Sequence, residues 1–346
     1  MKRGTKGISL AWRFLIWFVV VALLPLASFG YLSLRQNENA LRAETLARMS
    51  RLADKKTLEI KTYLAERMQD ARLLARGRLV EAAMADLSRT YARHRAGSAE
   101  YRKAASQFES NFAAYIGEGG DMLFYDVFLI TPQGEIIYTY KHEADFSTNL
   151  IDGPYRDSLL AQVFHEARMT FESNISGFEY YAPSDAPAAF TGAPIIREGK
   201  LLGIVVLQLD TQHVYRVALD NIGLGASGET VLAKLNNAGE ALFVAPLRHD
   251  PQAAMRRKMD LRTTAAPMRQ ALAGERGRGV EVNYAGRQIV AAWRYLPELR
   301  WGVVVKMDTG EAFAPLRQQR ENLLEILLVL AMLGGFAAFY LGRQIG

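Results

Sequence analysis

Two long apolar segments without a single charged residue lie near the two ends of this chain. They cover residues 14–34 and residues 326–342, and the sequence between them is mostly polar. A helix needs about 20 predominantly apolar residues to cross a bilayer, and the second segment is at the short end of that range. The pattern predicts two transmembrane helices, with the polar region looped out between them.

The charges that flank the first segment predict the orientation. Four basic residues and no acidic one precede it: Lys2, Arg3, Lys6 and Arg13. Cytoplasmic flanks are enriched in Lys and Arg, so we expect residues 1–13 in the cytoplasm and residues 343–346 on the same side. A cleaved signal peptide over residues 1–34 is the alternative. Its apolar stretch is longer than a usual signal core, and no small-x-small cleavage site follows.

Composition excludes several classes of function. The chain has no cysteine, which rules out disulfides and thiol catalysis. Its net charge of +6 comes from residues 1–103, whereas residues 104–320 carry more acidic than basic side chains. A nucleic-acid-binding protein needs a basic patch on its folded domain, so no nucleic-acid partner is expected.

Residues 35–118 are predicted to form one long helix or two helices in series. The stretch has no proline, and its apolar residues recur at helical spacing among charged ones. A helix of this length needs a surface to lie against. We expect it to serve as a spine for the following domain, as a seam between two copies of the chain along residues 35–75, or as both.

From residue 125 onward the pattern changes to strands. An apolar run, a turn at residues 131–134 and a second apolar run predict a hairpin. Further elements are predicted as a helix at 155–167 and strands at 179–181, 188–196 and 201–210.

The same strand-turn-strand pattern then recurs about 105 residues further along the chain. Both hairpin turns end in Gly-Glu, at Gly134-Glu135 and Gly239-Glu240, and the last strands of both copies end in aspartate, at Asp210 and Asp308. An internal repeat of one unit explains this agreement. In the second copy we expect a helix-like stretch near 250–273 and strands at 280–284 and 288–295.

The order of these features resembles the double-Cache sensor domains of bacterial histidine kinases, chemoreceptors and nucleotide cyclases. The resemblance covers residues 35–320 and rests on the two repeats between apolar segments and on one helical motif. That motif contains Lys56, Ile60, Tyr63-Leu64, Arg67, Asp70-Ala71 and Leu74-Ala75. The resemblance implies an α/β (α+β) fold with a long N-terminal helix and two tandem PAS-like modules with antiparallel sheets.

The resemblance also implies different roles for the two modules. A membrane-distal module at 119–215 would bind a small ligand, and a membrane-proximal module at 216–312 would transmit the signal. A connector at 313–325 would lead into the second span, and residues 343–346 resemble the start of a HAMP-type linker. The implied protein is a two-pass receptor of a bacterial inner membrane with a periplasmic sensor region, acting as a homodimer on a cytoplasmic output domain, most simply a histidine kinase.

A subgroup of this family binds amino acids through an Arg and a Trp-Tyr pair at the start of the helix after the first hairpin. Here Gly153 occupies the Arg position, Tyr155 is what remains of the aromatic pair, and Arg156 is displaced in register. The resemblance therefore does not favour an amino acid, and an organic acid or an amine-like ligand stays open.

Candidate ligand contacts combine aromatic and polar side chains of the distal module, as small-molecule pockets do. They are Tyr138, Tyr155, Arg156, Tyr181, Asp185, Phe190 and Asp210. For three of them a structural role competes. Tyr181 could simply pack in the core, Arg156 could pair with a neighbouring acid, and Asp210 could cap the following helix.

No catalytic, metal or cofactor site is predicted. The five histidines, at 94, 142, 165, 213 and 249, lack ligand spacing. The Gly-x-Gly-x-x-Gly run at 223–228 precedes a strand instead of following one, so it indicates a turn. Two other classes remain open: an element that acts through a protein partner without a small ligand, and a membrane-anchored extracytoplasmic enzyme.

Overall fold

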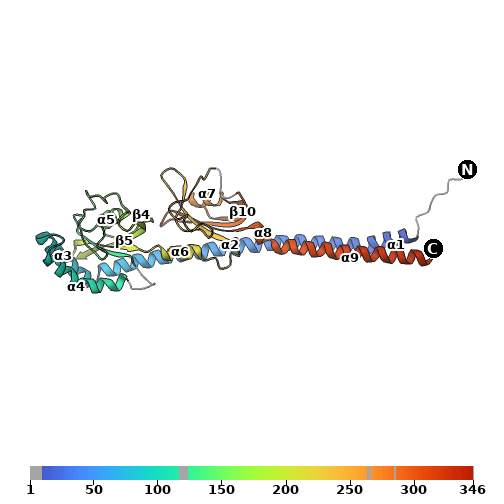
Figure 1. Cartoon of the computed structure of the whole chain (residues 1–346), viewed down its shortest axis with the longest axis horizontal. Coiled ribbons are helices and arrows are strands. Elements are labelled where there is room, and N and C mark those ends of the chain that lie inside the picture. Colours follow the sequence, from blue (N-terminus) through green and yellow to red (C-terminus); the bar gives the residue numbers. More distant parts are fainter. Residues whose placement is uncertain (1–9, 117–123, 263–265, 284–285, 346) are drawn as a thin grey trace.

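The computed structural model of the chain describes residues 10–116, 124–262, 266–283 and 286–345. Figure 1 shows an elongated molecule in which one long helix, α2 (Leu24–Ala75), runs along two β-sheet modules. The terminal helices lie together at one end of the molecule. We call the module farther from them the distal module (β1–β6 with α5) and the nearer one the proximal module (β7–β12 with α7).

The chain begins as a continuous helical run. Helix α1 (Leu10–Phe18) passes through a π-helical turn, η1 (Val19–Leu23), into α2. The π-turn lies immediately before Pro25, whose ring nitrogen has no hydrogen to donate to the preceding turn. Within the described residues, the helical run Ile16–Ala75 contains a stretch long and apolar enough to cross a membrane.

The C-terminal helix α9 (Ala314–Ile345) lies beside α1 and the start of α2 (Figure 1). Small residues permit this close approach. A Cβ on Gly30 would lie 2.7 Å from Leu323 Cδ1, and one on Gly334 would overlap the Phe18 ring. The predicted second span at 326–342 falls inside α9 and stays a prediction.

The prediction of one or two helices over 35–118 was wrong, because its described part contains three. After α2 come α3 (Arg78–His94) and α4 (Ala99–Ile116), which pack against each other. The first break falls at Gly77, which adopts extended backbone as the N-cap of α3. The second begins at Arg95, whose left-handed φ of 63° no helix can continue.

The distal module is an antiparallel sheet with helices on both faces. The strand order is β2-β1-β6-β5-β3, and β4 pairs with another part of β5. Apolar side chains such as Leu129 and Leu207 face α2, α3 and α4, whereas Phe128, Phe190 and Val206 face α5. The bounds are β1 Asp126–Ile130, β2 Ile136–Thr139, β3 Asn174–Ile175, β4 Glu179–Tyr181, β5 Ala186–Arg197 and β6 Lys200–Leu209.

The proximal module repeats this topology, with the order β10-β11-β12-β7-β8-β9. Each module pairs its first strand with both its second and its last strand, so β1 corresponds to β7 and β6 to β12. The predicted internal repeat is present in the fold. The bounds are β7 Glu229–Leu235, β8 Ala241–Phe243, β9 Lys258–Met259, β10 Gly277–Val282, β11 Gln288–Leu296 and β12 Trp301–Asp308.

Two predicted helices have different limits in the structure. The helix expected at 155–167 is α5 (Leu159–Thr170), because Ser158 caps its N-terminus by accepting from the Ala161 N–H at 3.2 Å. The described residues of the stretch near 250–273 are mostly turns and the short β9, and their helix is confined to α7 (Ala266–Leu272). Pro251 lies within a turn there, while Pro267 lies in the first turn of α7, where its missing N–H costs nothing.

Both modules are attached to α2 by buried or half-buried side chains. Lys56 donates to the carbonyl oxygens of Val217 and Asp220 at 2.6 and 2.7 Å, at the C-terminal end of α6 (Gln212–Leu219), which joins the modules. Arg294 of β11 donates to Ser50 and forms a two-pronged ion pair with Asp54, at 2.6 and 3.0 Å. These contacts hold α6 and the proximal sheet against α2.

Candidate functional site

The face of the distal sheet under α5 carries an aromatic wall. Phe128, Phe190 and Tyr181 come from β1, β5 and β4, and alternation along each strand turns all three to this face. The Phe190 ring centre lies 6.2 Å from that of Phe128 and 4.9 Å from that of Tyr181. This apolar wall ends at a group of buried polar side chains.

Asp126 begins β1 at the margin of this wall and is 0% exposed. One carboxylate oxygen accepts from the backbone N–H groups of Val127, Tyr140 and Lys141 at 2.7, 2.7 and 3.1 Å. Burial nevertheless raises the pKa of Asp126 to about 7, and the negative charge of Asp145 acts in the same direction.

Asp145 lies in the loop between β2 and α5 and is also 0% exposed. Its Oδ2 accepts from the Tyr181 hydroxyl at 2.6 Å. Burial raises the pKa of the Asp145 carboxyl, an effect that the Tyr181 hydrogen bond opposes and the Glu143 charge reinforces. Burial likewise raises the pKa of Tyr181, which keeps the phenol protonated as a donor.

Two further side chains complete the polar group. Glu143 accepts from the Tyr125 hydroxyl at 2.6 Å, and Gln208 of β6 donates its side-chain N–H to Ser184 Oγ at 3.1 Å. Gln208 is 2% exposed and stands opposite Asp126 in the β1–β6 register. The group therefore joins both central strands of the sheet to the loop after β2.

Each of these four residues keeps one buried oxygen without a donor in the described part of the chain. The atoms are Asp126 Oδ2, Asp145 Oδ1, Glu143 Oε2 and Gln208 Oε1. Leaving a buried polar atom unpaired costs about 1–3 kcal/mol, so such atoms are uncommon in folded proteins. All four are acceptors, and a bound molecule that brings hydrogen-bond donors would satisfy them.

Three of the predicted contact residues lie at this face. Tyr181 and Phe190 belong to the aromatic wall, and the Tyr155 ring lies 6.1 Å from the Tyr181 ring. Asp185 is close in sequence but exposed, and it accepts from the Tyr180 hydroxyl at 2.6 Å.

The other three predicted residues lie elsewhere. Tyr138 points to the opposite face of the sheet, where it packs on Phe112 of α4 at 5.1 Å. Arg156 has a side chain that is 58% exposed and approaches Asp157 at 3.6 Å, as the structural alternative expected. Asp210 accepts from the Gln212 N–H at 2.8 Å, in the turn that starts α6.

The residues that make this site polar were not predicted from the sequence; they are Asp126, Glu143, Asp145 and Gln208. Asp126 did carry a signal, because an acidic residue inside the apolar run 125–130 has to be buried with the strand. Asp145 and Glu143 carried none, because only the folded loop brings them to the sheet.

The sequence predicted no metal site, because the histidines lack ligand spacing. Within the described residues, no group of three or more His, Cys, Asp or Glu side chains could hold a metal ion. His213 instead stacks on Tyr63 of α2, with ring centres 4.2 Å apart.

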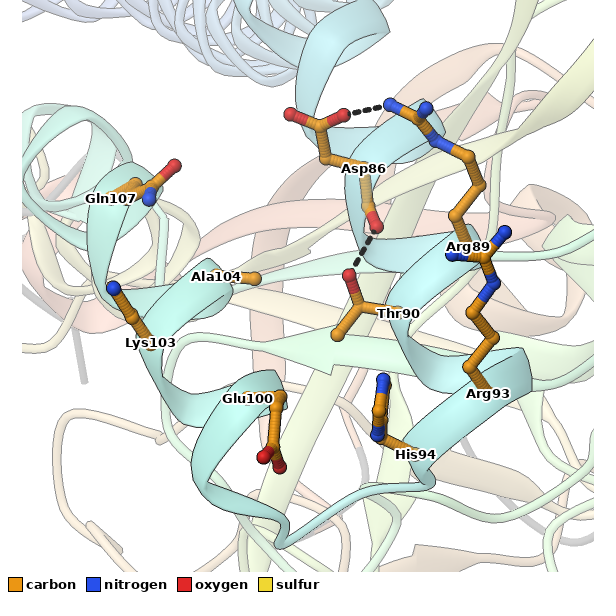
Figure 2. Close-up of a pocket in the computed structure, with 9 residues that line it drawn as sticks. All are labelled: Asp86, Arg89, Thr90, Arg93, His94, Glu100, Lys103, Ala104 and Gln107. Carbon is orange, nitrogen blue, oxygen red and sulfur yellow. Dashed lines mark hydrogen bonds and ion pairs between the residues drawn. The ribbon is translucent and has the colours of Figure 1, made fainter.

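A hollow of about 410 Å3 lies between α3 and α4 at the tip of the molecule. Figure 2 shows the residues that line it, with Arg89 and Arg93 on α3 and Lys103 and Gln107 on α4. Asp86 already pairs with Arg89. This groove is lined mainly by exposed, charged side chains, whereas the distal sheet face combines an apolar wall with buried, unpaired acceptors. The latter is the stronger candidate for a small-molecule site.

Comparison with known proteins places this fold. The family model of the Cache domain matches residues 37–316. The sensor domain of the histidine kinase DctB of V. cholerae is 15% identical, with a TM-score of 0.51 over 79% of this chain and 99% of that one. The ligand-binding domain of the Campylobacter jejuni chemoreceptor Tlp3, solved with 4-methylisoleucine, is 10% identical, with a TM-score of 0.53 over 79% and 94%. No curated protein sequence matches the chain.

These matches define the class of protein. The fold is that of the extracytoplasmic sensor domains of histidine kinases and chemoreceptors. The chain belongs to the double-Cache family.

Proposed function

We propose that this chain is the sensor part of a two-span membrane receptor, and that a small ligand binds to the distal module under α5. The four buried acceptor oxygens without donors carry this proposal, because they sit together at the end of an aromatic wall. The similarity in fold to a sensor domain solved with a small ligand supports it.

The proposed topology places residues 1–13 and 343–346 in the cytoplasm, with spans at 14–34 and 326–342. Large apolar side chains support the second span, because Leu328, Met332 and Phe336 of α9 are exposed in the isolated chain. Water disfavours such a continuous exposed surface, whereas lipid accommodates it.

Binding would reach the membrane through the contacts that tie both modules to the helices. Lys56 fixes α6, the helix between the two modules, to α2, and Arg294 fixes the proximal sheet to α2. Glu311, just before α9, accepts from the N–H groups of Ala226 and Ser227, both at 2.7 Å. A ligand with different affinity for two packings along α2 would shift their populations and move α9 relative to α1.

The partner in this scheme is a second copy of the chain, paired along residues 35–75. The exposed Leu58 and Leu73 of α2 support such a seam. The receiver is a cytoplasmic output domain, for which a histidine kinase is the first choice and a chemoreceptor signalling domain or a cyclase the alternative.

The test is a thermal-shift screen of the full chain in nanodiscs against amines, organic acids, amino acids and nucleobases. A ligand that binds only the folded state raises Tm with its concentration. We expect a saturable hit that Tyr181→Phe weakens, because the phenol orients Asp145. Tyr138→Phe is the matched control, because that hydroxyl faces the opposite side of the sheet. If no compound shifts Tm, or if Tyr138→Phe alone abolishes the shift, the proposed site is wrong.

A further inference from the structure

The two modules place a buried acidic residue at the same position of the same strand pair. Asp126 is the first residue of β1, and its register partner on β6 is Gln208. Glu229 is the first residue of β7, and its register partner on β12 is Lys306. Since β1 corresponds to β7 and β6 to β12, the two pairs occupy equivalent places in two copies of one fold.

In the proximal module this place contains its own ammonium group. Lys306 Nζ lies 2.8 Å from Glu229 Oε1, and both side chains are less than a tenth exposed. The surrounding side chains, such as Val231, Met268 and Ile289, leave a cavity of only about 20 Å3 beside Lys306. That is space for about one water molecule, so the proximal place is filled by the protein itself.

In the distal module the acid has a neutral partner. Gln208 replaces the lysine, and no ion pair forms at Asp126, Glu143 or Asp145 within the described residues. The four unpaired oxygens described above belong to Asp126, to its register partner Gln208, and to Glu143 and Asp145 of the loop after β2, and all are acceptors. An ammonium group is their chemical complement, because it has three N–H donors and no acceptor.

We propose that the distal module binds a ligand with a primary ammonium group, which lies between Asp126 and Gln208 as the Lys306 ammonium lies beside Glu229. This inference rests on the proposed receptor function and names the ligand class of its site. The apolar part of the ligand lies along Tyr181 and Phe190, as the lysine stem lies along its apolar neighbours. A free carboxylate is disfavoured near Asp145, and a quaternary ammonium lacks the N–H groups that the oxygens require.

The experiment is calorimetric titration of the full chain, in nanodiscs of neutral phosphatidylcholine, with ethylamine, 1,4-diaminobutane, tetramethylammonium and acetate. We expect saturable binding of the two primary amines and none of tetramethylammonium or acetate. Gln208→Lys installs the proximal arrangement in the distal module. It should raise Tm without ligand and weaken amine binding by roughly tenfold or more, as expected for a lost charge-assisted contact.

Gln133→Lys is the matched control, because it adds the same charge at an exposed turn of the same module. It should leave both Tm and amine binding unchanged. Should Gln208→Lys fail to fold, Asp126→Asn gives the same test, with an expected loss of amine binding of roughly tenfold.

The outcomes separate this inference from the function on which it rests. Amine binding that persists in Gln208→Lys or Asp126→Asn overturns the ammonium position. A wild-type chain that ignores all amines but binds another compound, in a way that Tyr181→Phe weakens, overturns the ligand class and leaves the receptor function intact. If no compound of either screen binds, both proposals fall.

Discussion

The distal and proximal modules share one topology, but they treat the same buried position in opposite ways. The proximal module neutralises Glu229 with Lys306 at 2.8 Å, whereas the distal module sets Asp126 opposite the neutral Gln208. A buried charge without a partner destabilises a fold and persists where function requires it. One copy of the repeat therefore pairs this acid with a cation of its own, whereas the other places the acid opposite a neutral side chain.

A second buried charge of the proximal module, that of Arg294, attaches this module to α2. Arg294 is 5% exposed and donates to Asp54, to the Ser50 hydroxyl and to three backbone carbonyl groups, those of Ser50, Gly277 and Trp293. These bonds make the proximal sheet and the long helix one unit. Among the described residues, no comparable cation pairs with the distal acids Asp126, Glu143 and Asp145.

The largest effect is expected when this attachment is cut. Arg294→Met should destabilise the chain by about 4 kcal/mol, because several buried acceptors lose their donor at once. Urea unfolding of the full chain in detergent measures the change. Arg276→Met removes the exposed contact to the same Asp54, at 3.2 Å, and should cost less than about 1 kcal/mol. Equal losses in both variants would mean that burial does not determine the strength of this attachment.

The next effect concerns the closed ion pair. Lys306→Met should cost about 3 kcal/mol, because it leaves Glu229 buried without its ammonium partner. The double variant Lys306→Met with Glu229→Gln should recover most of that loss in the same urea assay. As a control, Lys234→Met breaks a more exposed pair with Glu179 and should cost less than about 1 kcal/mol. If the double variant were as unstable as the single one, the lysine would matter for packing and not for charge.

The buried acids of the distal module should make the stability of the chain depend on pH. The pKa of Asp126 is raised to about 7 by burial, and that of Asp145 is raised as well. The folded state therefore binds protons more tightly than the unfolded chain, so this contribution to stability is complete below about pH 4 and is lost as pH rises to about 7. The slope should reach at most about 1.4 kcal/mol per pH unit for each group.

The variant Asp126→Asn isolates the Asp126 part of that slope. Its unfolding free energy should depend less on pH between about 4 and 7 than that of the wild type, and at pH 7 it should be equal or higher. Denaturant titrations at several pH values provide the comparison. A wild-type slope of opposite sign would mean that Asp126 has a cationic partner in the folded chain.

The smallest effect is expected at Arg156. Because its side chain is 58% exposed and pairs only with the neighbouring Asp157, Arg156→Ala should change stability by less than about 0.5 kcal/mol. It should also leave the affinity of any distal ligand unchanged in calorimetric titration. A marked loss of affinity would return Arg156 to the site and would favour an anionic ligand.

Strand periodicity and turn residues made much of the fold predictable from the sequence. The strand expected at 179–181 is β4, and the recurring Gly-Glu turns correctly indicated a duplicated unit. The helices were placed less well. The start of α5 depends on the Ser158 cap, and the described stretch before α7 forms turns and the short β9, which bury Ala253 and Met259 in the proximal core.

The candidate site was predictable only in part. Tyr181 and Phe190 could be found because aromatic residues on a strand must face one side of a sheet, and one side of this sheet was expected to hold the ligand. Tyr138 obeys the same rule and faces the other way, because it pairs with Leu129, whose side chain faces the helices α2, α3 and α4. Sequence alternation gives two faces but does not say which one a given residue occupies.

The sequence by itself determined the apolar ends, the long helix and the repeated strand pattern, because all three depend on local spacing of apolar residues. Only the tertiary structure decided which charges meet. Asp126 and Gln208 are far apart in the chain, as are Glu229 and Lys306, and strand pairing alone makes them neighbours. Whether a buried acid pairs with a cation depends on residues far apart in the sequence. In this protein Glu229 of the proximal module has Lys306 as its partner, whereas Asp126 of the distal module lies opposite Gln208.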